Sequence, residues 1–199
     1  MSQTNRPHVL VAFHSGYGHT AVLAEAVVRG ALSAGAEATP VPVDTITEEQ
    51  WAQLDNADAI VFGAPTYMGT ASAAFHTFAQ ESSKRWNIQA WEGKLAAGFT
   101  NSGAKAGDKS STLDYFATMA AQHGMHWVSL GLQPGWARTT GNENDLNRLG
   151  YFSGAAGQSP VDGGPEEVHK SDIATAEHLG ARVARVAAVF LAGRAALAA

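Results

Sequence analysis

The chain has 199 residues, near the usual size of one domain, and 45% of them are apolar whereas 16% are charged. This balance predicts a folded protein with a sizeable core, and the formal net charge of -5 argues against nucleic acid or an acidic membrane as the main partner. The sequence contains no cysteine, which excludes disulfides, thiol redox chemistry and cysteine-ligated metals, so any redox role requires a bound cofactor.

Strand and helix patterns alternate along the chain. Short apolar runs predict strands at residues 8–13, 37–43, 58–63, 94–100 and 125–130. Apolar residues at helical spacing predict helices at residues 20–34, 71–81 and 171–197, and capping residues predict two more, from Asp44 or Thr45 to Leu54 and from Ser110 to about Gln122. This order predicts an α/β fold with a doubly wound five-stranded parallel sheet covered by helices on both faces.

The stretch over about residues 131–169 is rich in Gly, Asn and Pro and has weak periodicity. We interpret it as a functional or interface insertion within a single domain that spans residues 1–199. No signal-peptide pattern precedes the first strand, and arginines interrupt the apolar C-terminal helix. We therefore expect a cytoplasmic protein without a membrane span.

The first predicted strand runs through a glycine-containing loop directly into a helix. The loop consists of Ser15, Gly16, Tyr17, Gly18, His19 and Thr20. Unpaired amides and the helix dipole at such a corner favour a phosphate, although an ordinary capped turn is the alternative. A nucleoside triphosphate is disfavoured because no lysine precedes Thr20, and a serine nucleophile would need glycine in place of His14. A dinucleotide site remains a rival, since Gly16-x-Gly18-x-x-Ala21 fits its relaxed fingerprint and Asp44 could bind the ribose.

Two further loops follow the third and fourth strands. The first presents Pro65, Thr66, Tyr67, Met68 and Gly69, and the second begins with Thr100, Asn101, Ser102, Gly103 and Ala104. Tyr67 and Met68 suit contact with a flat aromatic ring, and the second loop offers amides to the polar edge of such a ring. Each loop alone fits an ordinary surface loop, but ligands in doubly wound sheets bind beyond the carboxyl ends of the strands, so together they predict one site.

Four stretches, at residues 15–20, 64–78, 93–103 and 120–131, resemble the flavodoxin-like NAD(P)H:quinone oxidoreductases, the tryptophan-repressor-binding protein group. The resemblance implies strand order 2-1-3-4-5, one FMN per subunit, hydride transfer from NAD(P)H through FMN to quinones, and a homotetramer. It places the FMN phosphate at residues 15–20, the ring beside Thr66, Tyr67 and Met68, and its polar edge at residues 101–104. It also implies that His123 contacts FMN, often across a subunit boundary, and that Tyr17 and Trp86 lie on the nicotinamide and quinone side.

Tyr17 and His123 are the candidates for lining the site where donor and acceptor react. Alternatively, Tyr17 covers the phosphate and His123 caps the helix that ends before Gly124. Trp86 is either a pocket wall or a subunit contact. The other histidines show no metal-ligand spacing, so we expect no metal site. Rival functions are a one-electron carrier of the flavodoxin type, disfavoured by the scattered acidic residues, and a low-activity FMN-binding regulatory relative.

Overall fold

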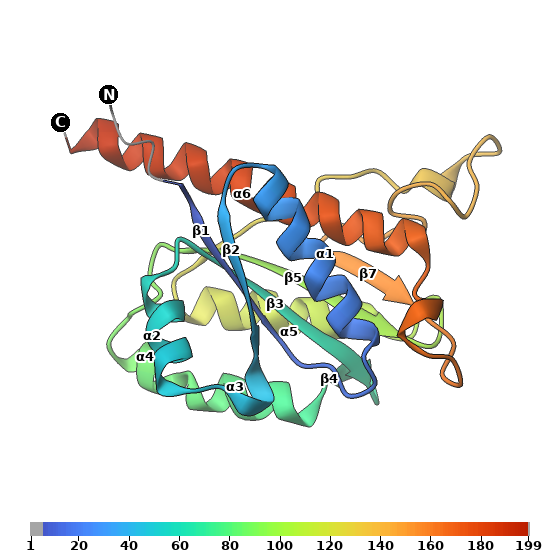
Figure 1. Ribbon diagram of the computed structural model, residues 1–199, viewed down its shortest axis with the longest axis horizontal. Helices are drawn as coiled ribbons and strands as arrows, with labels where there is room; N and C mark the ends of the chain where they lie inside the picture. Colours follow the sequence, from blue (N-terminus) through green and yellow to red (C-terminus); the bar gives the residue numbers. More distant parts are fainter. Residues whose placement is uncertain (1–5, 199) are drawn as a thin grey trace.

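The computed structural model describes residues 6–198, and a mainly parallel β-sheet forms its centre (Figure 1). The strands are β1 (His8–Phe13), β2 (Glu37–Pro42), β3 (Ala59–Tyr67), β4 (Thr70–Ala71), β5 (Leu95–Ser102), β6 (His126–Trp127) and β7 (Ala155–Gln158). The main path is β2-β1-β3-β5-β6, while β4 pairs with β3 and β7 pairs with β5. Counted over the parallel strands of this path, the order is 2-1-3-4-5, which confirms the predicted flavodoxin-like topology.

Helices cover both faces of the sheet. They are α1 (His19–Ser33), α2 (Glu48–Asn56), α3 (Ala73–Glu81), α4 (Ser83–Asn87), α5 (Lys109–Gln122) and α6 (Lys170–Leu197), with 3-10 turns η1 (Val43–Thr45), η2 (Gly135–Ala137) and η3 (Pro165–Glu167). Val9 and Val11 of β1 face α1 and α6, whereas Leu10 and Ala12 face α2, α3 and α5. Because both faces are covered, the strands are continuous apolar runs. Within the described chain, no helix is long and apolar enough to cross a membrane.

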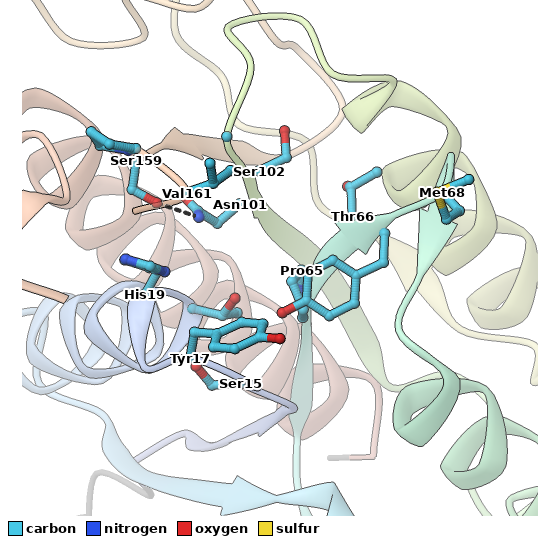
Figure 2. Close-up of a pocket in the computed structure, with 14 residues that line it drawn as sticks. Ser15, Tyr17, His19, Pro65, Thr66, Met68, Asn101, Ser102, Ser159 and Val161 are labelled. Atoms are coloured by element: carbon cyan, nitrogen blue, oxygen red, sulfur yellow. Dashed lines mark hydrogen bonds between the residues drawn. The ribbon is translucent and has the colours of Figure 1, made fainter. Parts of the chain in front are cut away.

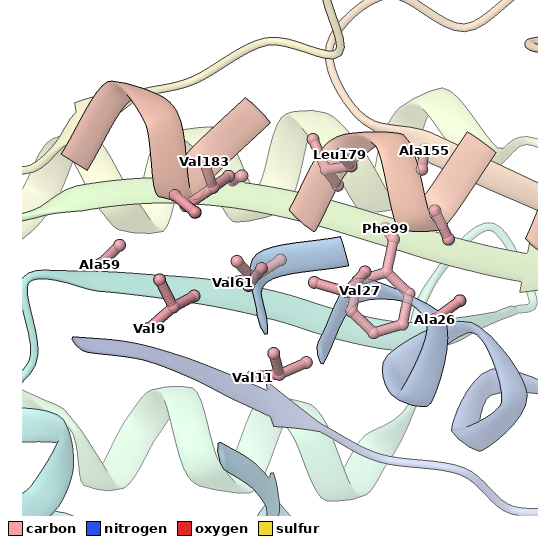
Figure 3. Packing of buried hydrophobic residues seen from close by; sticks show 14 of the residues in the cluster. Val9, Val11, Ala26, Val27, Ala59, Val61, Phe99, Ala155, Leu179 and Val183 are labelled. Carbon is pink, nitrogen blue, oxygen red and sulfur yellow. The ribbon is translucent and has the colours of Figure 1, made fainter. Parts of the chain in front are cut away.

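Two glycines bring α1 and α6 into direct backbone contact. A Cβ added at Gly30 would lie 1.8 Å from the Glu177 carbonyl oxygen, and one at Gly180 would lie 1.9 Å from the Val27 carbonyl oxygen. Figure 3 shows the valines and leucines of this layer packed between the sheet and the two helices. The close crossing fixes the position of α1, and therefore of the loop that precedes it.

The fifth strand of the sheet differs from the single strand predicted at residues 125–130. Only β6 forms there, and it pairs with Leu95 and Ala96 of β5. The chain then leaves the sheet and returns as β7, which pairs with Phe99–Ser102 at the same edge. A Cβ at Gly154 would lie 2.2 Å from the Gly98 carbonyl oxygen, so only glycine fits where the returning chain meets β5. Two separate segments therefore occupy one strand position.

Several predicted boundaries are wrong by a few residues. Strand β3 continues past residue 63 to Tyr67, because its later residues pair with β5, and it turns back into β4 through Met68 and Gly69. These two residues have φ of 49° and 83°, as a two-residue hairpin turn requires. Helix α3 accordingly begins at Ala73 rather than at residue 71.

Two predicted helix caps are also wrong. Thr47, not Asp44 or Thr45, caps α2, since its side chain and that of Gln50 form a reciprocal capping box. Helix α5 begins at Lys109, so Ser110 lies inside the helix, and Asp108 precedes it in the left-handed conformation.

Candidate functional site

A cavity of about 370 Å³ opens at the carboxyl ends of β1, β3 and β5 (Figure 2). Its lining residues are Ser15, Tyr17, His19, Thr20, Pro65, Thr66, Tyr67, Met68, Asn101, Ser102, Gly103, Ser159, Pro160 and Val161. The three loops singled out in the sequence therefore meet at one place. Gly16, Gly18, Gly69 and Ala104 belong to these loops without lining the cavity, and Thr100 is fully buried beneath it.

The first loop presents an unused set of hydrogen-bond donors. Among residues 6–198, no acceptor is positioned for the main-chain amides of residues 16–20. Ser15 Oγ accepts from the Ala21 amide at 3.1 Å and keeps its own hydrogen for another partner. The Thr20 hydroxyl, at the cavity wall, makes no hydrogen bond to the described chain. These donors lie at the positive end of the α1 dipole, so the loop is suited to an anion.

His19 and Gly18 join this loop to η3. Carbonyl oxygens only accept, so His19 Nε2 donates to the oxygens of Gly163 and Gly164, at 3.1 and 3.0 Å. Gly18 has φ of 88°, and a Cβ there would lie 2.5 Å from Pro165 Cγ. The structure therefore requires glycine at this position, because the η3 segment occupies the space that a side chain would need.

The second loop forms the mouth of the cavity. The rings of Tyr17 and Tyr67 meet edge to face with centroids 6.4 Å apart. Met68, at the tip of the hairpin, is completely exposed, and Tyr17 is 76% exposed. Burial, followed by the neighbouring Tyr17, raises the pKa of Tyr67, so its hydroxyl keeps its hydrogen. The mouth is therefore open, apolar and aromatic.

Buried hydroxyl groups fix the second loop against the third. Thr100 Oγ1 donates to the Ala64 carbonyl oxygen at 2.7 Å, so Thr66 is the donor in its 2.8 Å bond to Thr100. Thr66 in turn accepts from Thr112 of α5 at 2.8 Å. Thr100 thus positions Thr66 at the cavity wall and does not line the cavity itself.

Asn101 links the third loop to a segment that the sequence did not assign to the site. Its Nδ2 donates to Ser159 Oγ at 2.8 Å, drawn as a dashed line in Figure 2. Ser159, Pro160 and Val161 follow β7 and complete the cavity wall. The available signal was the Gly-, Asn- and Pro-rich composition of residues 131–169, which indicated a functional segment but not which residues lie at the site.

The structure does not bring His123 and Trp86 to this cavity. Helix α5 runs back along the sheet from the carboxyl ends of the strands, so His123, which caps its C-terminal end, lies at the opposite end. There both residues line a separate groove of about 260 Å³. Ser82 Oγ donates to the Ala79 carbonyl oxygen at 2.7 Å, so His123 Nε2 donates to Ser82 at 2.9 Å. Burial against Trp91 lowers the pKa of His123 and leaves its Nδ1 without a donor among the described residues.

The dinucleotide alternative finds little support in the cavity. Asp44, the residue expected to bind a ribose, lies in η1 and is not among the lining residues. The lining residues include no lysine, arginine, aspartate or glutamate. The site therefore offers amide and hydroxyl donors, aromatic rings and one histidine whose Nε2 is already engaged.

Comparisons with known proteins identify the family. The model of the NADPH-dependent FMN reductase family matches residues 23–132, more than half of the chain. Flavodoxin FldP of Pseudomonas aeruginosa is 42% identical over 181 residues, covering 89% of this chain and 95% of its own. An NAD(P)H dehydrogenase (quinone) of Rhizobium rhizogenes is 32% identical over 203 residues, covering 92% and 98%. The crystal structure of a flavodoxin, a WrbA-like protein from Agrobacterium tumefaciens, is 41% identical, with a TM-score of 0.72 over 91% of this chain and 97% of its own. The chain therefore belongs to the NADPH-dependent FMN reductase family and, within it, to the flavodoxin-like NAD(P)H:quinone oxidoreductases.

Proposed function

We propose that the protein transfers two electrons from NAD(P)H to quinones, using FMN bound in the cavity at the ends of β1, β3 and β5. The main support is the set of unpaired amides at residues 16–20, beside the hydroxyl groups of Ser15 and Thr20. A dianionic phosphate is the group that such a set favours, and it needs no lysine or arginine there. FMN, the cofactor of this family, has that phosphate at one end and a flat ring at the other.

The rest of the cavity fits the ring. Pro65, Thr66 and Tyr67 offer one wall, and Asn101, Ser102 and Gly103 offer polar groups on another. A Cβ at Gly16 would lie 2.9 Å from the Tyr67 hydroxyl oxygen, so glycine is needed for Tyr67 to lie against the first loop. We assign FMN contacts to residues 65–67 and 101–103, to Met68 at the rim, and to the loop of residues 15–20, which we call the phosphate loop.

FMN supplies the hydride chemistry when it is bound, and the protein supplies position and electrostatic environment. Tyr17, Tyr67, Met68 and Val161 form an apolar mouth in which a nicotinamide and then a quinone would lie against the ring. A tyrosine hydroxyl is protonated at neutral pH, and burial raises the pKa of Tyr67 further, so its hydroxyl would be a donor for a quinone oxygen. No carboxylate lines the cavity, so we assign no acid–base pair to the reaction.

The decisive experiment is steady-state oxidation of NADH and NADPH after reconstitution with FMN. We expect oxidation to depend on added FMN and to accelerate strongly when benzoquinone is present. Protein that does not quench FMN fluorescence would refute the cofactor assignment. Protein that binds FMN but oxidises neither nucleotide would refute the enzymatic part.

An electron carrier is the second candidate, because the 42% identical relative is named a flavodoxin. A carrier would bind FMN equally well but would need a separate reductase to receive electrons. Adding such a reductase to protein that is inactive with NADH and NADPH distinguishes the two functions. Scattered acidic residues and the uncharged cavity lining favour the enzyme.

The proposal includes a single FMN-binding domain that assembles as a homotetramer in the cytoplasm. Trp86 is half exposed beside the groove that contains His123, and Ile88 is 73% exposed. Burying these side chains against another subunit would remove apolar surface from water. Light scattering coupled to gel filtration tests the assembly: four chains are expected, and a monomer at micromolar concentration would refute it.

A further inference from the structure

We propose that Lys109, Tyr151 and Gln158 are positioning residues for FMN. They turn the carbonyl groups of residues 103–106 toward the protein, so that the amides that follow Gly103, the last residue of this loop to line the cavity, face outward. This inference rests on the proposed function, since it concerns the same bound FMN. It assigns a role to a buried lysine and to the insertion.

Lys109 is completely buried, although it is a lysine at the start of α5. Its ammonium group donates to the carbonyl oxygens of Ala104, Lys105 and Ala106, the latter two at 3.1 and 3.5 Å. Three acceptors match the three hydrogens of an ammonium group. Lysine is rarely fully buried unless it is paired, so this arrangement indicates that the loop conformation depends on it.

Two residues of the insertion, Tyr151 and Gln158, complete the set. Tyr151 donates its hydroxyl hydrogen to the Ala106 carbonyl oxygen at 2.6 Å, and Gln158 Nε2 donates to the Gly103 carbonyl oxygen at 3.0 Å. Four consecutive carbonyl groups are therefore bound by side chains: those of residues 104–106 by the nearby Lys109, and those of Ala106 and Gly103 by the distant Tyr151 and Gln158. In a trans peptide, the carbonyl and the next amide point in opposite directions. The amides of residues 104–106 consequently point away from these side chains, and none donates to another group of the described protein.

A buried ion pair fixes Gln158 in turn. Arg148 and Asp172 form a bidentate pair with two N–O distances of 2.8 Å, and both side chains are nearly inaccessible. Asp172 also accepts from the main-chain amide of Gln158 at 3.0 Å, while Arg148 donates to the side-chain oxygen, Oε1, of Gln158 at 3.3 Å. The oxygen of the Gln158 side chain is thereby engaged, which directs its Nε2 toward Gly103.

This arrangement would act on FMN through charge. Fixed outward amides, with an ammonium group behind them, stabilise negative charge placed at the rim. Reduction adds electrons to the flavin, so the reduced cofactor should gain more from this loop than the oxidised one. The three positioning residues would therefore raise the midpoint potential as well as the affinity for FMN.

The test compares Lys109→Met with Lys84→Met, which removes the same charge from an exposed side chain of α4 that does not line the cavity. We measure FMN affinity by fluorescence quenching and the two-electron midpoint potential against a reference dye. For Lys109→Met we expect the affinity for oxidised FMN to fall about tenfold and the affinity for reduced FMN to fall about 100-fold. The additional tenfold loss in the reduced state corresponds to a two-electron midpoint potential that is about 30 mV lower. Lys84→Met should leave both quantities unchanged.

Tyr151→Phe provides a milder variant if Lys109→Met fails to fold, because it removes only one hydroxyl group. It should shift both quantities in the same direction by a smaller amount. Unchanged potential in Tyr151→Phe and in folded Lys109→Met would overturn this inference alone, even if their stability fell. Wild-type protein that does not bind FMN would instead overturn the proposed function, and this inference with it.

Discussion

Replacing Gly18 by alanine tests whether the phosphate loop depends on its contact with η3. An L-residue at φ of 88° costs about 1–2 kcal/mol. The new Cβ would lie 2.5 Å from Pro165 Cγ, so the η3 segment would have to retreat by about 1 Å to restore ordinary contact. That movement would break the His19 hydrogen bonds to Gly163 and Gly164, at a cost of about 1 kcal/mol.

The sum is about 2–3 kcal/mol, which corresponds to a loss of about 30- to 150-fold in FMN affinity if all of it is expressed in binding. Titration of apoprotein with FMN, followed by fluorescence quenching, measures the loss. Gly35→Ala is the matched control, because Gly35 also has positive φ, 87°, but a Cβ there meets nothing within 4 Å. The backbone strain in Gly35→Ala should lower the free energy of unfolding by about as much as in Gly18→Ala, but FMN affinity should stay unchanged. Wild-type affinity in Gly18→Ala would refute the reasoning.

Three further changes test the packing and the buried charges. Gly180→Ala should lower the free energy of unfolding by about 3 kcal/mol or more in a urea titration, because the Cβ would lie 1.9 Å from a main-chain oxygen of α1. Gly193→Ala is the control on the same helix: its Cβ would lie in open space, so this change should raise the free energy of unfolding by about 1 kcal/mol. Asp172→Ala leaves Arg148 buried without its partner and should cost about 3–5 kcal/mol by the same measurement; a loss below about 1 kcal/mol would contradict this. Burial lowers the pKa of Lys109 from 10.5 to about 8, so between these values the unfolded chain binds a proton that the folded chain has released, and stability rises with pH. Between about pH 7 and pH 9.5, the free energy of unfolding of the apoprotein should therefore rise by about 2 kcal/mol relative to that of its Lys109→Met variant. If the difference between the two free energies does not change with pH, Lys109 does not titrate in this range.

Local patterns predicted the parts of the fold that depend on local chemistry. The apolar run of β1, the glycines of the first loop and the periodicity of α1 are short-range signals, and each determines its element without reference to distant residues. Parallel strands then require crossovers of one hand, so a doubly wound sheet and the end at which the loops meet follow from the element order, whereas the strand order was implied by the family resemblance. This is why three loops distant in sequence could be assigned to one cavity.

The features that the sequence did not reveal depend on distant contacts. Strand β7 consists of Ala-Ala-Gly-Gln, which contains no β-branched or aromatic residue typical of strands, and it forms because β5 offers a free edge there. Ser159 was missed for the same reason. Lys109 looks like an ordinary surface lysine in the sequence, since the carbonyl groups that bind it belong to a loop rather than to charged residues. The direction of α5 places His123 at the other end of the sheet from the cavity of the same chain, so the FMN contact implied by the resemblance stays a prediction that requires a second subunit.

The interrupted edge of the sheet also bears on engineering. Because the chain departs after β6 and rejoins the same edge at β7, the register of β7 is set by β5 and not by the length of the segment between them. Residues 138–144 of that segment are largely exposed. A peptide tag or a fluorescent reporter inserted there should leave the hydrogen-bond ladder and the cavity at the strand ends intact, and would offer an attachment point for immobilising the protein on an electrode.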